Sequence, residues 1–138
     1  MDLSDCYRKG QIKKTRVDKG LIRSLIEMSG IKESTVKEAK LTEKNISVYV
    51  CVAYDSLREI LEAVCIYNGY KVLSHICIGE LLRKIVPDFD YVGFDRMRYI
   101  RNAINYYGTK ADFEQGKQII EKIFKMRKDI LEKHIKDI

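Results

Sequence analysis

The sequence has one proline, Pro87, and no tryptophan, and it contains no long apolar run. Few helix-breaking residues, together with plentiful lysine, glutamate, isoleucine and leucine, favour helices over a turn-rich β fold. No apolar stretch approaches the about 20 residues that a membrane-spanning helix needs, and the N-terminal residues do not resemble a signal peptide. We therefore expect a cytoplasmic protein that does not enter a membrane.

The four cysteines form no C-x-x-C pair, and only two histidines are present to complete a metal site. We therefore expect neither a metal nor a cofactor. Because free cysteines are commonly buried, Cys6, Cys51, Cys65 and Cys77 are interpreted as reduced, mostly buried thiols. Their even number leaves disulfide pairing in a secreted protein as the alternative. No Walker-type, G-x-G-x-x-G, H-E-x-x-H or G-x-S-x-G motif occurs, so most common enzyme classes lose support.

A chain of 138 residues fits one domain, and apolar residues recur every three or four positions along five stretches. The first helix is predicted from Asp18 to Ala39, and a break near Gly30 is left open as an alternative. The other four helices are predicted over Ile46 to Val64, Ser74 to Ile85, Asp90 to Tyr107 and Lys110 to Ile135. Gly69, Pro87 and Gly108 are the expected stops. The predicted fold is all-α: an up-and-down four-helix bundle with an additional short helix, formed by residues 17–138 after a basic N-terminal lead, residues 1–16.

Positive charge gathers at both ends of the chain, although the net charge is only +6. Seven cations lie between residues 8 and 23, relieved only by Asp18. Such a cluster of positive charge is typical of a surface that binds a polyanion such as RNA. The alternative interpretation is a solvated helix face.

A second group of polar side chains falls within the helix predicted over residues 90–107. Arg98, Arg101 and Asn105 are spaced at i, i+3 and i+7, which places them on one helical face. An arginine there can hold a phosphate with two hydrogen bonds while an amide orients a neighbouring group. Alternatively, the arginines pair with carboxylates of another helix, for which the candidates are Asp55, Glu59 and Glu62.

The segment Arg101-Asn102-Ala103-Ile104-Asn105-Tyr106-Tyr107-Gly108 resembles the signature of HEPN domains, in which an arginine, often followed by asparagine, precedes a histidine by four to six residues. The stretch from Tyr54 to His75 is similar to the second and third helices of archaeal members. The resemblance covers roughly residues 17–135. It implies a metal-independent ribonuclease site at a homodimer interface, where the arginine stabilises charge on the scissile phosphate and the histidine moves a proton.

Tyr106 stands where this signature has its histidine. A tyrosine, with an ordinary pKa of about 10, is a poor base near neutral pH. The catalytic candidates are therefore Arg101 and Tyr106, with catalysis expected to be impaired. The candidate RNA- or nucleotide-binding residues are Arg98, Arg101, Asn102, Asn105 and Tyr107, supported by Asp55, Glu59 and His75. Tyr106 and Tyr107 also fit simple packing at the bundle edge.

The leading hypothesis is an HEPN-like homodimer that binds RNA or a nucleotide without efficient cleavage. The resemblance places it in a prokaryotic defence or toxin–antitoxin system, with a minimal nucleotidyltransferase as a candidate partner. The first alternative is an active metal-independent ribonuclease that uses Arg101 with Tyr106 or His75. The second is a helical protein–protein interaction module. Arg127 and His134 also have the arginine-to-histidine spacing, but they fall in the last helix, outside the place of the motif.

Overall fold

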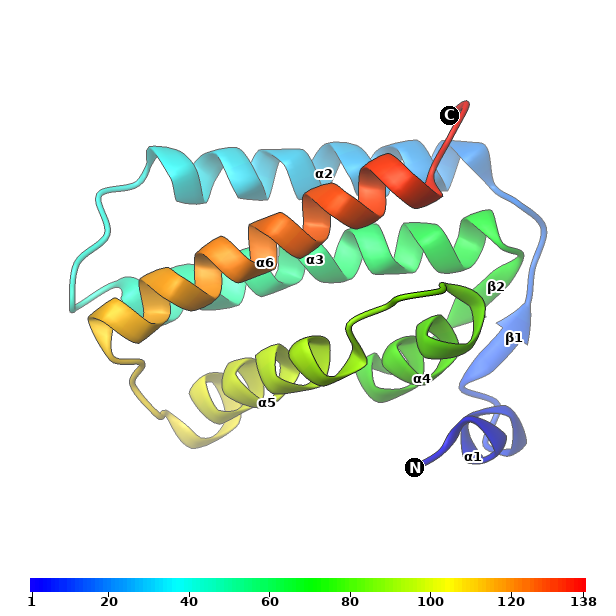
Figure 1. Ribbon diagram of the computed structural model, residues 1–138, viewed down its shortest axis with the longest axis horizontal. Helices are drawn as coiled ribbons and strands as arrows, with labels where there is room; N and C mark the ends of the chain where they lie inside the picture. Colours follow the sequence, from blue (N-terminus) through cyan, green and yellow to red (C-terminus); the bar gives the residue numbers. More distant parts are fainter.

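The computed structural model describes all 138 residues and is predominantly helical. Its elements in chain order are α1 (Leu3–Arg8), β1 (Ile12–Lys14), α2 (Lys19–Glu38), α3 (Ile46–Tyr67), β2 (Tyr70–Val72), α4 (His75–Ile85), α5 (Tyr91–Tyr107) and α6 (Phe113–His134). In Figure 1, α2, α3 and α6 occupy the upper part of the molecule and α4 and α5 lie below them. The all-α bundle with one additional short helix is thereby confirmed. None of the helices combines the length and the apolar character needed to cross a membrane.

The five predicted helices are present, and their ends follow the expected capping chemistry. Asp18, Ser74 and Asp90 each accept a hydrogen bond from a backbone amide in the first turn of their helix. Gly108 ends α5 in the left-handed conformation, at φ +65°. No break occurs at Gly30: α2 is continuous, and Gly30 lies beside the guanidinium of Arg127.

Helix α3 is the centre of the core and is covered by α2, α6, α5 and α4. Its buried residues include Tyr54, Leu57, Ile60 and Leu61, none of which is exposed to solvent. Helix α6 comes closest to α3 at Gly116, where an added Cβ would collide with Ile46. The deep burial of α3 fixes the position of every side chain that it sends toward α4 and α5.

Residues 1–16 form α1 and β1, which pack on the bundle. β1 pairs antiparallel with β2, which places Ile12 opposite Val72 and Lys13 opposite Lys71. These strands are only three residues long, too short to show a clear alternating pattern in the sequence.

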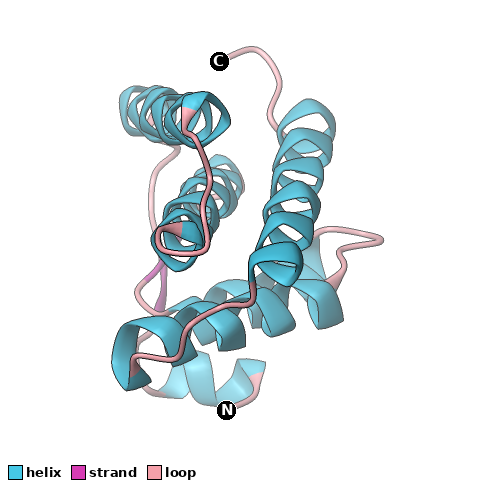
Figure 2. Cartoon of the chain, turned by 90° about the vertical axis from the view of Figure 1, so that its left-hand side faces the viewer, coloured by secondary structure: helices cyan, strands magenta, loops and turns pink.

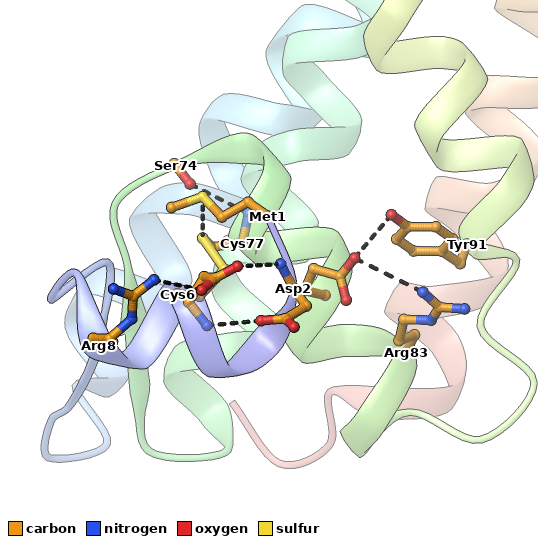
Figure 3. The surroundings of a disulfide bond; sticks show 10 residues. Met1, Asp2, Cys6, Arg8, Ser74, Cys77, Arg83 and Tyr91 are labelled. Atoms are coloured by element: carbon orange, nitrogen blue, oxygen red, sulfur yellow. Dashed lines mark hydrogen bonds and ion pairs between the residues drawn. A yellow bond between two sulfur atoms is a disulfide. The ribbon is translucent and has the colours of Figure 1, made fainter.

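The expectation of four reduced cysteines is wrong for Cys6 and Cys77, which form a disulfide between α1 and α4 (Figure 3). The pairing of β1 with β2 turns α1 back onto α4, and the two Cα atoms lie 5.8 Å apart despite a sequence separation of 71 residues. No spacing in the sequence indicates this contact. Cys51 and Cys65 are free, as expected, and burial raises the pKa of Cys65 to about 12.

Candidate functional site

A pocket of about 290 Å³ lies between the N-terminus of α4 and the middle of α5. Its lining consists of His75, Ile76, Arg98, Arg101, Asn102 and Tyr106. All of these except Ile76 are residues that the sequence singles out. Ser74 caps α4 and so places His75 at the first helical position, while α5 presents its polar residues on one face. The structure thus brings together a histidine and a motif arginine that lie 26 residues apart in the sequence.

Arg101 is held in place mainly by uncharged groups. Its Nη1 donates to Asn102 Oδ1 at 3.3 Å. With the Asn105 amide oxygen turned toward the guanidinium, that oxygen accepts from Nε at 3.0 Å and from Nη2 at 3.3 Å. The nearest carboxylate, Asp55, is 3.9 Å from Nη2, at the limit of an ion pair. The positive charge of Arg101 is therefore positioned but only weakly neutralised.

Aromatic rings border the same guanidinium. Its central carbon lies 5.7 Å from the ring centre of Tyr54 and 5.9 Å from that of Tyr106. Both distances are within the range of cation–π attraction. Tyr54 is fully buried, whereas Tyr106 is 70% exposed, so Arg101 marks the boundary between the core and the open side of the pocket.

The other two arginines near the pocket have carboxylate partners on their own helices. Arg98 donates to Asp95 from Nε at 3.2 Å and from Nη2 at 2.7 Å. Arg58 of α3 lies 2.5 Å from Glu62. Arg101 is thus the cation of the site with the least complete ion pair.

His75 is neutral near pH 7 in this environment. Burial, followed by the charges of Arg58 and Arg101, lowers its pKa to about 4. Its Nδ1 lies 3.0 Å from the hydroxyl of Tyr54. Burial keeps Tyr54 protonated by raising its pKa, and His75 is the only hydrogen-bond partner of its hydroxyl. With the Tyr54 hydroxyl as the donor to Nδ1, the neutral ring carries its proton on Nε2.

The remaining predicted site residues lie outside the pocket lining. Asn105 contacts Arg101 and also lies 3.4 Å from Cys51 Sγ, on the α3 side of the guanidinium. Tyr107 is 83% exposed. Glu59 pairs with Lys32 of α2 at 2.8 Å and is not part of the site. The alternative in which carboxylates neutralise the motif arginine applies only to Asp55, and only loosely.

The second arginine–histidine pair has a structural explanation. Arg127 is buried, and it donates to Ser29 Oγ at 2.7 Å and to Glu33 at 3.1 Å. These contacts fasten α6 to α2. Arg127 therefore belongs to a contact between helices, and it does not line the pocket between α4 and α5.

The sequence gives no signal for two features of the site. Tyr54 falls within an apolar helical stretch, and nothing local shows that its hydroxyl reaches His75 across the α3–α4 contact. A separate groove of about 1090 Å³ between α5 and α6 is also unexpected. Figure 2 shows these two helices diverging on one side of the bundle. The groove forms because α5 and α6 diverge and do not pack closely against each other. The apolar periodicity of the sequence does not predict this divergence.

No group of three histidine, cysteine or carboxylate side chains is placed to hold a metal ion. The chain matches no protein-family model, and no curated protein or solved structure is significantly similar to it. The HEPN-like assignment accordingly stays a prediction that depends on the short motif and on the helix order.

Proposed function

We propose that this protein is an HEPN-like RNA- or nucleotide-binding protein that holds a phosphate group in the pocket formed by His75, Arg98, Arg101 and Asn102. The observation that carries the proposal is the state of Arg101: its guanidinium is fixed by amides, faces an open pocket and has its nearest carboxylate 3.9 Å away. A bound phosphate would supply the missing negative charge, with bidentate hydrogen bonds that suit an arginine.

The size and lining of the pocket favour a small part of a nucleotide over a large ligand. About 290 Å³ lies near the lower limit of ligand pockets, which suits a phosphate with its sugar. Tyr106 lines the open side, where its exposed ring can stack on a base. The amide of Asn102 adds a donor and an acceptor for a ribose hydroxyl.

The hydrogen bond from Tyr54 to His75 favours binding over cleavage. A general base must accept a proton at a nitrogen that faces the substrate. When Nδ1 of His75 accepts from the Tyr54 hydroxyl, 3.0 Å away, the other nitrogen carries the proton. His75 therefore acts as a hydrogen-bond donor to a phosphate oxygen. Cleavage by Arg101 with His75 or Tyr106 is the alternative that this arrangement disfavours.

A homodimer is part of the proposal, and the exposed face of α5 supports it. Val92, Tyr99 and Tyr106 recur every seven residues and are 78%, 72% and 70% exposed. Apolar and tyrosine side chains in such a row are enriched at protein interfaces. The α5–α6 groove lies beside this row, so a second copy could cover both. Tyr106 would then lie at the dimer contact and at the pocket rim, as the HEPN resemblance implies.

The test is the affinity for a fluorescein-labelled oligouridylate and for uridine monophosphate, measured by anisotropy and calorimetry. Arg101→Gln is expected to weaken both affinities by about tenfold or more, since a charged hydrogen bond contributes roughly 1.5–3 kcal/mol. Arg83→Gln is the matched control, because Arg83 is an exposed arginine of α4 that lines neither the pocket nor the α5–α6 groove. Equal losses in both variants, or no loss in Arg101→Gln, would contradict the proposal. The proposal also includes a toxin–antitoxin role and a nucleotidyltransferase partner, and only the HEPN resemblance supports these two parts.

A further inference from the structure

The outer face of the β1–β2 ribbon is formed by two lysines directly opposite one another. Lys13 pairs with Lys71 in the antiparallel register, so their side chains project from the same face of the ribbon. Both residues are exposed. Like charges in this position destabilise a strand pair.

The ribbon tolerates this repulsion because other contacts hold it. Ile12 is buried opposite Val72 on the inner face. Backbone hydrogen bonds continue on both sides of the strand pair, from Thr15 to Gly69 at 2.9 Å and from Leu73 to Gln11 at 2.8 Å. The disulfide between α1 and α4 anchors the helix that precedes β1. These contacts therefore hold in place the backbone that carries the two lysines.

No carboxylate neutralises this face. Lys14 and Arg16 follow Lys13 and are exposed, and neither they nor the paired lysines form an ion pair. The acidic residues closest in sequence are engaged elsewhere: Asp5 contacts Arg8, and Asp18 caps α2. The cations of the ribbon are therefore free to bind a polyanion.

The ribbon also leads directly into the proposed binding pocket. β2 ends at Val72, and His75 begins α4 three residues later. Lys71 is thus separated from His75 by at most about 14 Å of extended chain. Figure 1 shows β1 and β2 at the same end of the molecule as α4. Tyr7 adds an exposed aromatic ring beside this end, next to the phenol of Tyr70.

We infer that Lys13 and Lys71 on the outer face of the β1–β2 ribbon, together with the neighbouring exposed cations Lys14 and Arg16, bind the phosphates of single-stranded RNA next to the nucleotide held in the pocket. This inference rests on the proposed function, because it takes the pocket as the place where one nucleotide of the strand is fixed. The ribbon extends the contact without reading the sequence, since phosphate contacts position a strand and do not distinguish bases.

The test compares the double variant Lys13→Gln/Lys71→Gln with the wild type, using a 12-nucleotide oligouridylate and uridine monophosphate as probes. RNA affinity is expected to fall by tenfold or more, while the affinity for the mononucleotide stays within twofold. A plot of log affinity against log salt concentration should become shallower by about 1.4, since each phosphate contact on a single strand contributes about 0.7. Lys44→Gln/Lys128→Gln, at two exposed lysines outside the α5–α6 groove, is the control with the same change in net charge, and it should leave the slope unchanged.

The possible results separate this inference from the function on which it rests. Equal losses in the two double variants would overturn the inference, because they would show only a general effect of net charge. An unchanged salt slope in the ribbon variant would also overturn it. So would selective loss of binding to phosphatidylserine vesicles with RNA binding intact, which would assign the ribbon to an anionic membrane surface. Failure of Arg101→Gln to weaken mononucleotide binding refutes the pocket instead, whatever the ribbon variant does.

Discussion

The hydroxyl of Tyr54 lies 3.0 Å from Nδ1 of His75, and this contact links the centre of the core to the rim of the pocket. Tyr54 is fully buried on α3, while His75 begins α4. When the Tyr54 hydroxyl donates in this contact, the proton of the neutral imidazole is on Nε2. A residue of the core thus determines whether the pocket histidine donates or accepts.

The titration of His75 is the first prediction that follows. Burial and the neighbouring Arg58, Arg101 and Arg98 disfavour its charged form, and Asp55 opposes them incompletely, so the pKa falls to about 4. The protein has only two histidines, which makes the imidazole signals in an NMR titration easy to assign. One resonance should therefore titrate near pH 4. A His75 midpoint at the ordinary value of about 6.5 would contradict the described environment.

The same shift determines how stability depends on pH. The pKa of His75 is lower in the folded state than in the unfolded state, so the unfolded chain binds more protons between about pH 6.5 and pH 4. The stabilising contribution is present above this range and is lost as the pH falls through it. The free energy of unfolding, measured with urea, should fall less between pH 7 and pH 4.5 in His75→Gln than in the wild type. His134→Gln is the comparison, because His134 is less buried, and this variant should change the pH-dependent loss less.

Restoring the motif histidine should create cleavage activity if the pocket is an HEPN-like site. Tyr106 lines the pocket with its ring centre 5.9 Å from the Arg101 guanidinium carbon, so a histidine there would lie close to a bound phosphate. We expect Tyr106→His to cut mixed RNA in EDTA while the wild type does not. The double variant Tyr106→His/Arg101→Gln should be inactive. Cleavage by the wild type that Arg101→Gln abolishes would instead identify an enzyme with a different proton carrier.

The exposed row on α5 gives a test of oligomeric state. Tyr99 is the middle residue of this row and is 72% exposed. A charge at the centre of an apolar interface is costly, so Tyr99→Glu should shift a dimer to a monomer in light scattering at micromolar concentration. Val48→Glu replaces an exposed apolar residue of α3 outside the row and should leave the dimer intact. A monodisperse monomer in the wild type would refute the homodimer.

The disulfide between Cys6 and Cys77 should make a large contribution to stability. It spans 71 residues of sequence, and closing a loop of that length restricts the unfolded chain by about 4 kcal/mol in the entropic description. The variant Cys6→Ser/Cys77→Ser is expected to lose roughly 2–4 kcal/mol in urea unfolding. Dithiothreitol should produce the same loss in the wild type and none in the variant. Equal stability with and without the reductant in the wild type would contradict the prediction.

The helices were predictable because their determinants are local. Ser74 and Asp90 cap helices that they immediately precede, and Gly108 supplies the conformation that ends α5. The placement of Arg98, Arg101 and Asn105 on one face follows from helical spacing alone, although Asn105 contacts Arg101 from outside the pocket lining. These features need no knowledge of how the helices pack.

The features that escaped prediction depend on contacts between distant segments. Cys6 meets Cys77 only because two three-residue strands pair and turn α1 back on the bundle. Glu59 was expected near Arg101, but its position on α3 directs it to Lys32 of α2. The orientation of a buried helix about its own axis decides which neighbour a side chain meets. A periodic pattern identifies the buried face without identifying the partner.

The most direct test of the central claim is an NMR titration of the wild-type protein with uridine monophosphate, following the arginine side-chain Nε–Hε signals and the histidine rings. Binding in the pocket predicts that Arg98, Arg101 and His75 shift together along one saturable curve. Arg127, which is buried against Ser29 and Glu33, should not move. Shifts confined to arginines outside the pocket, or no saturable shift at millimolar nucleotide, would contradict the claim that this pocket binds a phosphate.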